Sequence, residues 1–200
     1  EADGIFINTA GVGFVNPQYR FAPDNIRSGD RIILNGSVGE HGTAVFAKRL
    51  GVSFKPELLS DSAPLAQSVA ALLAAGITPR VMRDITRGGL ATIICELVAG
   101  SGYNAHLDEK AIPIDPRVKR ACDIWGFDPL HVASEGRFVL VVEPDKAEAA
   151  VAVLKTVEAS GGAAIIGEIT EGKGRSAIRT EIGGKRLIHP LPDELLPRIC

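Results

Sequence analysis

The chain has 200 residues, of which 46% are hydrophobic and 23% are charged, with a formal net charge of −2 at pH 7 and a pI near 6.1. These values describe an ordinary globular chain and give no general attraction for a nucleic-acid backbone, so nucleic acid is not an expected partner. No apolar run approaches the roughly 18 residues of a membrane span, and no basic-then-apolar leader opens the chain. The sequence therefore predicts a cytoplasmic protein without membrane association.

The hydrophobic pattern predicts a mixture of strands and helices along the chain. Strands are expected over residues 4–9, 30–36, 78–83, 137–143 and 163–169, and helices over residues 43–50, 64–75, 89–99, 116–125 and 144–160. The segments 176–182 and 185–188 flank a two-residue glycine turn, which predicts a hairpin. Because strict strand–helix–strand alternation is absent, we expect an α+β fold in which a mixed, largely antiparallel sheet carries its helices on one face.

The sequence predicts that the chain is divided into three structural parts. Residues 1–28 read as the remnant of a preceding domain and a linker, because a strand-like run follows almost directly after Glu1. Residues 29–189 form the α+β domain. Residues 190–200 contain three prolines, which fix φ and remove hydrogen-bond donors, so an extended arm is expected there.

The arm ends on Cys200, which makes this thiol the first candidate for chemistry. A side chain at a chain end can be presented to a partner or moved into a pocket. Arg198 favours the reactive thiolate, whereas the terminal carboxylate disfavours it. The alternative is that a cysteine at this position has no role. Cys95 and Cys122 lie among apolar neighbours and are expected to be buried and inert.

Metal and disulfide sites are not expected. The three cysteines form no Cys-x-x-Cys pair, and the four histidines share no ligand spacing.

A glycine-rich loop at residues 84–90 joins a predicted strand to a predicted helix. Its glycines would allow backbone N–H groups to approach an anion at the start of the helix. Asp84 and Thr86 are equally typical of a capped tight turn, and both interpretations stay open.

Two further loops carry ionisable side chains. Residues 36–42 hold Glu40 and His41, which could transfer protons or steer a ligand, or could be a solvated or capping pair. Residues 128–137 place Glu135 directly before a buried strand. Glu135 is a candidate general base, and the alternative is a surface ion pair with Arg137.

Together these motifs carry a family resemblance. The Asp-x-Thr-x-Gly-Gly-Leu loop at residues 84–90 resembles the carboxy-terminal domain of the superfamily of aminoimidazole ribonucleotide synthetase and selenophosphate synthetase. Residues 36–42, 128–136 and the terminal Pro-Arg-Ile-Cys at 197–200 make the chain similar to one branch, the HypE family of hydrogenase-maturation carbamoyl dehydratases. The resemblance covers essentially the whole chain.

The resemblance implies an activity for the full-length protein. The thiol of Cys200 would receive a carbamoyl group from the carbamoyltransferase HypF, and ATP-dependent dehydration would convert it to a thiocyanate. Cyanide would then pass to iron for a nickel–iron hydrogenase, on a HypC–HypD complex. Glu135 would be the base and Arg198 would orient the cargo. The implied cofactor-binding residues are Asp84, Thr86, Arg87, Gly88 and Gly89.

The chain departs from the family pattern at its beginning. The resemblance implies an earlier domain that holds ATP and Mg and supplies much of the homodimer contact, and we expect the missing part of that domain to lie upstream of Glu1. We therefore expect the isolated chain to be inactive, with ATP and Mg bound well only by the full-length protein. Two other functions stay open: another ATP-dependent synthetase of the superfamily, and a non-catalytic module that docks onto maturation partners.

Overall fold

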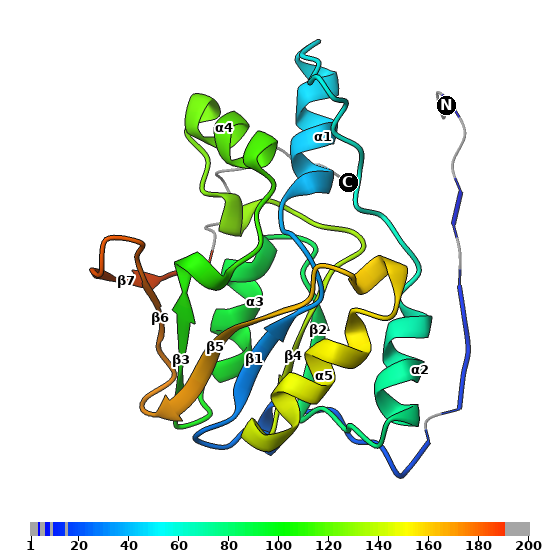
Figure 1. The fold of residues 1–200 in the computed structure, drawn as a ribbon, viewed down its shortest axis with the longest axis vertical. Coiled ribbons are helices and arrows are strands. Elements are labelled where there is room, and N and C mark those ends of the chain that lie inside the picture. Colours follow the sequence, from blue (N-terminus) through cyan, green and yellow to red (C-terminus); the bar gives the residue numbers. More distant parts are fainter. Residues whose placement is uncertain (1–3, 5–6, 9, 15, 191–200) are drawn as a thin grey trace.

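The computed structural model describes residues 4, 7–8, 10–14 and 16–190, and its centre is a seven-stranded sheet with the order β2-β4-β1-β5-β3-β6-β7 (Figure 1). Among the described strands, every pairing is antiparallel except the parallel pair β3–β6. The strands are β1 Arg31–Leu34, β2 Val81–Asp84, β3 Tyr103–Asp108, β4 Phe138–Val142, β5 Ala164–Glu171, β6 Ser176–Arg179 and β7 Lys185–Ile188. The mixed, largely antiparallel sheet of an α+β fold is thus confirmed.

Five α-helices accompany the sheet within the described ranges. They are α1 Glu40–Arg49, α2 Ala66–Ala74, α3 Gly89–Val98, α4 Pro116–Trp125 and α5 Ala147–Leu154. Helix α4 has the expected bounds because its ends are marked locally: Asp115 accepts a hydrogen bond from the Arg117 N–H, Pro116 opens the first turn, and Gly126 ends the helix at φ 74°.

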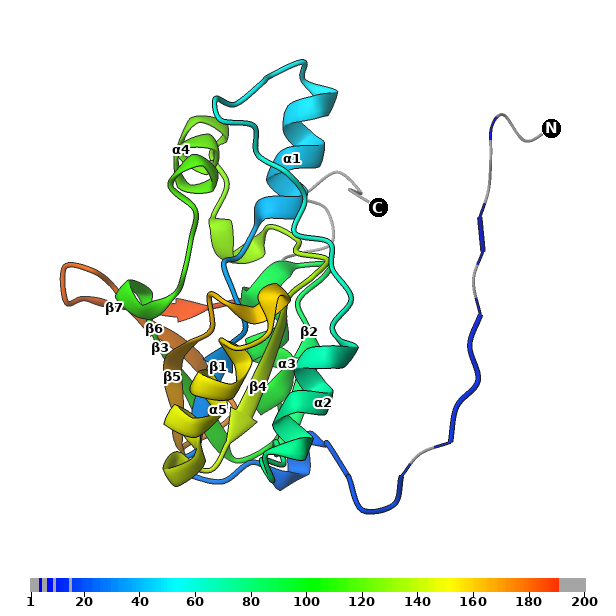
Figure 2. The same cartoon turned by 45° about the vertical axis from the view of Figure 1, so that its right-hand side comes forward.

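The helices cover both faces of the sheet, so the prediction that they lie on one face is wrong. Ile32 and Leu34 of β1 pack in the core cluster that contains α3, whereas Ile33 packs in the cluster that contains α2 and α5. Figure 2 shows α3 on the opposite side of the sheet from α2 and α5. All five residues of β4 are buried, as expected of a strand covered on both faces.

Three further elements differ from expectation. The predicted helix at 144–160 is a 3-10 turn, α5 and a second 3-10 turn, and the second turn is separated from α5 because Val157 adopts an extended conformation at φ −103° and ψ 125°. Strand β3 was not predicted, although its inward residues alternate. In the predicted strand at 4–9, the described residues Gly4, Ile7 and Asn8 lie in no strand, and the other residues lie outside the described part.

Helices α1 and α4 lie beyond one end of the sheet, where they pack on each other (Figure 1). A small core of Leu58, Val118, Cys122 and Val132 joins α4 to the loop before β4. This arrangement closes one side of the sheet end at which the three predicted loops lie.

Leu140 provides a test of the two-sided core. It is fully buried in the inner strand β4, so we expect Leu140→Ala to lower the free energy of unfolding by about 2–5 kcal/mol in urea denaturation. Leu187 of the edge strand β7 is 52% exposed, and Leu187→Ala should cost less than about 1 kcal/mol. Equal losses for the two variants would contradict this description of the core.

Candidate functional site

The three predicted loops meet at one end of the sheet because of strand direction. Strand β4 runs antiparallel to both β1 and β2, so its beginning lies beside their ends, with Val139 opposite Leu34 and Phe138 opposite Asp84. The loops that follow β1 and β2 are therefore placed against the loop that precedes β4. The fold thus brings together segments 36–42, 84–90 and 128–137.

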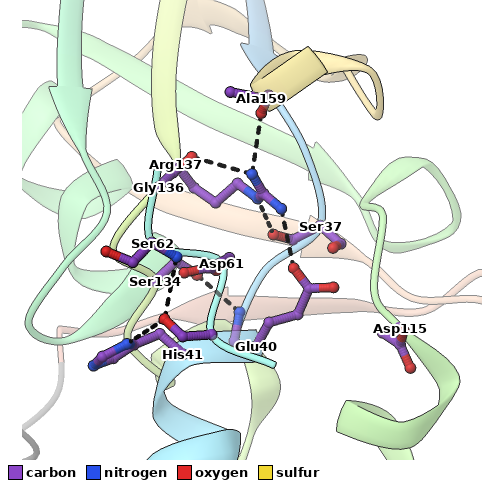
Figure 3. Close-up of polar contacts among 12 residues, drawn as sticks. Ser37, Glu40, His41, Asp61, Ser62, Asp115, Ser134, Gly136, Arg137 and Ala159 are labelled. Carbon is purple, nitrogen blue, oxygen red and sulfur yellow. Dashed lines mark hydrogen bonds and ion pairs between the residues drawn. The ribbon is translucent and has the colours of Figure 1, made fainter. Parts of the chain in front are cut away.

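The Arg137 guanidinium joins the 36–42 loop to its own loop and to Ala159, in the segment before β5 (Figure 3). Its Nε–H donates to the Ser37 carbonyl at 2.9 Å, and one terminal nitrogen donates to the Gly136 and Ala159 carbonyls at 3.1 Å each. The other terminal nitrogen donates to Glu40 Oε2 at 3.0 Å, and the two side chains are only 15% and 17% exposed. The ion pair that Arg137 forms with Glu40 is therefore largely buried rather than at the surface.

Glu135 lies between two neighbouring segments that hold its backbone. The Ser134 N–H donates to the Ile85 carbonyl and the Ile85 N–H donates to the Arg137 carbonyl, both at 3.2 Å. On the other side, the Glu135 N–H donates to Asp61 Oδ1 at 2.8 Å. The candidate base is thus half-buried on a backbone that is fixed on both sides.

The sequence analysis did not identify residues 60–63 as part of the site. Besides the Asp61 contact, Ser60 Oγ lies 2.8 Å from His41 Nδ1 and accepts from the Ser62 N–H (Figure 3). A Cβ on Gly136 would lie 1.9 Å from the Asp61 carbonyl oxygen, so the segment crosses Gly136 directly. No sequence motif marks Asp61, because its partner is 74 residues away.

The loop at 84–89 forms a tight turn at the start of α3. Gly88 and Gly89 have φ values of 77° and 62°, which favour glycine. A Cβ on Gly89 would lie 2.4 Å from the Leu130 carbonyl oxygen, and one on Gly88 would lie 2.4 Å from Thr92 Oγ1. Packing within the chain therefore accounts for both glycines. A direct phosphate contact from this loop stays a prediction.

The polar residues of this loop are more open to solvent. Asp84 and Arg87 are exposed and Thr86 is half-buried, and the Gly89 N–H donates to the Thr86 carbonyl at 3.1 Å. The side chains of Asp84 and Arg87 thus remain accessible beside the Glu135 loop.

The two helices that begin here both approach the loop before β4. The first α1 turn packs against it, with the Gly39 N–H donating to Ser134 Oγ at 2.9 Å and the Gly42 N–H donating to the Ala133 carbonyl at 3.0 Å. Ser134 is fully buried. The side chain at 134 therefore links the α1 start to the residue that precedes Glu135.

The cysteines within the described residues have suppressed reactivity. Cys122 is fully buried, which raises the pKa of its thiol to about 11. Cys95 is only partly buried, contrary to expectation, and burial still raises its pKa while its thiol lies 3.4 Å from the Ile188 carbonyl. Cys200 and Arg198 lie outside the described residues.

No group of three or more His, Cys, Asp or Glu side chains suited to a metal ion occurs among residues 4, 7–8, 10–14 and 16–190. In the same part of the chain, no helix is both long and apolar enough to cross a membrane.

Comparison with known proteins decides the family. A model described as "AIR synthase related protein, C-terminal domain" matches residues 27–179. The chain belongs to this family. The HypE resemblance is also confirmed: the protein named carbamoyl dehydratase HypE of Bradyrhizobium diazoefficiens is 43% identical over 202 residues, covering 100% of this chain and 58% of that protein. The chain thus spans somewhat over half the length of this relative.

Solved structures agree with this placement. A crystal structure of the hydrogenase maturation protein HypE in complex with ATP is 37% identical with a TM-score of 0.85, covering 90% of this chain and 55% of that one. A crystal structure of a HypE–HypF complex is 36% identical with a TM-score of 0.78, covering 84% and 55%. The relatives of this chain are therefore hydrogenase-maturation proteins.

Arg137→Lys tests the guanidinium contacts. A lysine ammonium cannot reproduce the planar set of donors, so we expect the free energy of unfolding to fall by about 2–4 kcal/mol in urea denaturation. Arg31 pairs with Glu168 at 2.6 Å but is 41% exposed, and Arg31→Lys should cost less than about 1 kcal/mol. A loss at Arg137 no larger than that at Arg31 would contradict the role given to Arg137.

The raised pKa of Cys122 has a chemical consequence. At about pH 7.5 almost none of this buried thiol is thiolate, so iodoacetamide should leave Cys122 unmodified in the folded protein. The same sample in urea should be alkylated at Cys122, as peptide mass spectrometry would show. Rapid alkylation of Cys122 without denaturant would show that burial does not protect it.

Proposed function

We propose that the full-length protein is a carbamoyl dehydratase of hydrogenase maturation that carries its cargo on Cys200. The observation that carries this proposal is the similarity over the whole chain to proteins named carbamoyl dehydratase HypE. The terminal Pro-Arg-Ile-Cys supplies a thiol in the position that the activity requires.

The chemistry converts an S-carbamoyl group to a thiocyanate. The carbon–oxygen bond breaks, the carbon–nitrogen bond becomes triple, and both N–H protons leave the nitrogen, one to a base and the other to the departing phosphate. Glu135 is the proposed acceptor of a proton, because a carboxylate on a fixed backbone can be held at one distance from a bound amide. Arg198 would orient the cargo by charge-assisted hydrogen bonds to oxygen.

The arm is long enough to reach Glu135. His131 Nε2 lies 3.0 Å from the His189 carbonyl oxygen, so the chain leaves the domain beside the loop that carries Glu135 four residues further on. Residues 190–200 span up to about 36–40 Å when extended, and residues 131–135 up to about 14 Å. The reach of the arm therefore supports delivery of Cys200 to Glu135.

When bound, ATP would supply the phosphoryl group that makes the carbamoyl oxygen a leaving group. A related HypE binds ATP, which supports its use here. Asp84, Thr86, Arg87, Gly88 and Gly89 are the proposed contacts, with the exposed Arg87 best suited to a phosphate.

Magnesium is a different case, because the described residues offer no cluster of carboxylates for it. We propose that ATP and Mg bind mainly to a preceding domain and that residues 1–200 alone are inactive. Residues 1–28 are proposed as the remnant of that domain with a linker, residues 29–189 as the α+β domain and residues 190–200 as the arm.

HypF is the proposed carbamoyl donor, since a related HypE forms a complex with it. Three further proposals rest on the family resemblance alone. They are that HypC–HypD accepts the cyanide, that the full-length protein is a homodimer, and that it is located in the cytoplasm.

Intact mass of the terminal peptide tests the proposal. We expect full-length protein incubated with HypF, carbamoyl phosphate and ATP to gain a carbamoyl group on Cys200 and then lose water. Cys200→Ala should acquire no adduct, and Glu135→Gln should acquire the carbamoyl group but lose water at least about a hundredfold more slowly.

Other results would favour the alternatives. Absence of any adduct at Cys200, with ATP still turned over, would favour another synthetase of the superfamily. Absence of both adduct and turnover, with HypF still bound, would favour a docking module.

A further inference from the structure

We propose that Asp61 is the positioning residue of Glu135, which it holds in place by its carboxylate while the carbamoyl group is dehydrated. This inference rests on the proposed function, because it assigns a partner to the proposed base. Asp61 comes from the segment between α1 and α2, which no motif marks.

The contact is direct and short. Asp61 Oδ1 accepts the Glu135 N–H at 2.8 Å, a distance typical of a charge-assisted hydrogen bond. Asp61 is only 7% exposed, so little solvent competes for this bond. The carboxylate therefore fixes the backbone of the residue that the reaction uses, rather than a neighbouring one.

The backbone of Asp61 is fixed as well. Its carbonyl oxygen occupies the space where a Cβ on Gly136 would lie, 1.9 Å away. On the opposite side, Ile85 forms backbone hydrogen bonds with Ser134 and Arg137. Asp61 thus completes a two-sided clamp in which Ile85 holds the flanking residues and Asp61 holds Glu135 itself.

A second observation separates Asp61 from a residue that only fills space. Its Oδ2 is buried and finds no hydrogen-bond partner among the residues that the structure describes. A buried carboxylate with one unpaired oxygen costs stability. Such a cost is expected where a side chain serves a site, since local rules of stability are broken chiefly there.

The consequence for the reaction is geometric. A displacement of about 1 Å at a reacting group can cost about a hundredfold in rate. Without the Asp61 carboxylate, Glu135 keeps its side chain but loses one of the contacts that hold it. The dehydration step should therefore suffer, whereas loading of Cys200 by HypF does not use Glu135.

The test uses full-length protein and follows the mass of the terminal peptide through both steps. We expect Asp61→Ala to load Cys200 within about twofold of the normal rate but to lose water at least about tenfold more slowly. Asp61→Asn keeps an oxygen acceptor for the Glu135 N–H and should dehydrate within about threefold of the normal rate. Rescue by asparagine is the readout that a general loss of stability would not give.

Asp30 supplies a matched control. It is 1% exposed, and its Oδ2 accepts the Arg27 N–H at 2.8 Å, so it makes the same kind of contact at the other end of β1. Asp30→Ala should lower the melting temperature at least as much as Asp61→Ala does. It should leave the dehydration rate within about twofold.

Three results would overturn the inference. In the first, Asp61→Ala slows loading as much as it slows dehydration. In the second, Asp61→Asn slows dehydration as much as Asp61→Ala does. In the third, Asp30→Ala slows dehydration as much as Asp61→Ala does. If Asp61→Ala does not fold, Asp61→Ser replaces it. The serine side chain is shorter, so dehydration as fast as in Asp61→Asn would then overturn the inference.

Failure of the proposed function would look different. Normal dehydration in Glu135→Gln would remove Glu135 as the base, whatever Asp61 does. Slow dehydration in Glu135→Gln together with normal dehydration in Asp61→Ala would overturn only the role of Asp61.

Discussion

The candidate site depends on burying one guanidinium where three loops meet. Arg137 is largely withdrawn from water, and such a group is tolerated only when its donors are satisfied. One carboxylate and three carbonyl groups, from Glu40, Ser37, Gly136 and Ala159, provide this. Because these partners come from separate loops, satisfying one charge also fixes the loops relative to each other. The Glu135 backbone takes its position from this arrangement.

Much of the fold is encoded locally and could be read from the sequence. Helix α4 was predicted with its observed bounds because a cap, a proline and a glycine mark its ends. The β6–β7 hairpin was predicted from its glycine turn, and its strands pair with Arg179 opposite Lys185. The prediction of helices on one face failed for a different reason. The run at Phe138–Val142 shows that a strand is buried, but its covering helices are distant in sequence.

The difference between local signals and contacts distant in sequence also explains which site residues were identified from the sequence. Glu135, the 84–90 loop and Cys200 stand in short motifs, so sequence alone singled them out as candidates. Glu40 and Arg137 were noticed but not paired, because 97 residues separate them. Asp61 has no motif of its own, and its contact with Glu135 exists only once the chain folds. Strand β3 was missed because its six residues are only partly apolar and one of its neighbours, β6, pairs in parallel.

Burial also separates the roles of the cysteines. A thiol that carries a carbamoyl group must react as thiolate, and competing thiols would divert the group. The fold raises the pKa values of both Cys95 and Cys122 by desolvation, so neither competes well at neutral pH. Under the proposed function, selectivity for the terminal thiol would then need no special activation of Cys200. It would follow from the withdrawal of the other two thiols into the domain, while Glu135 stays half-buried at the sheet end.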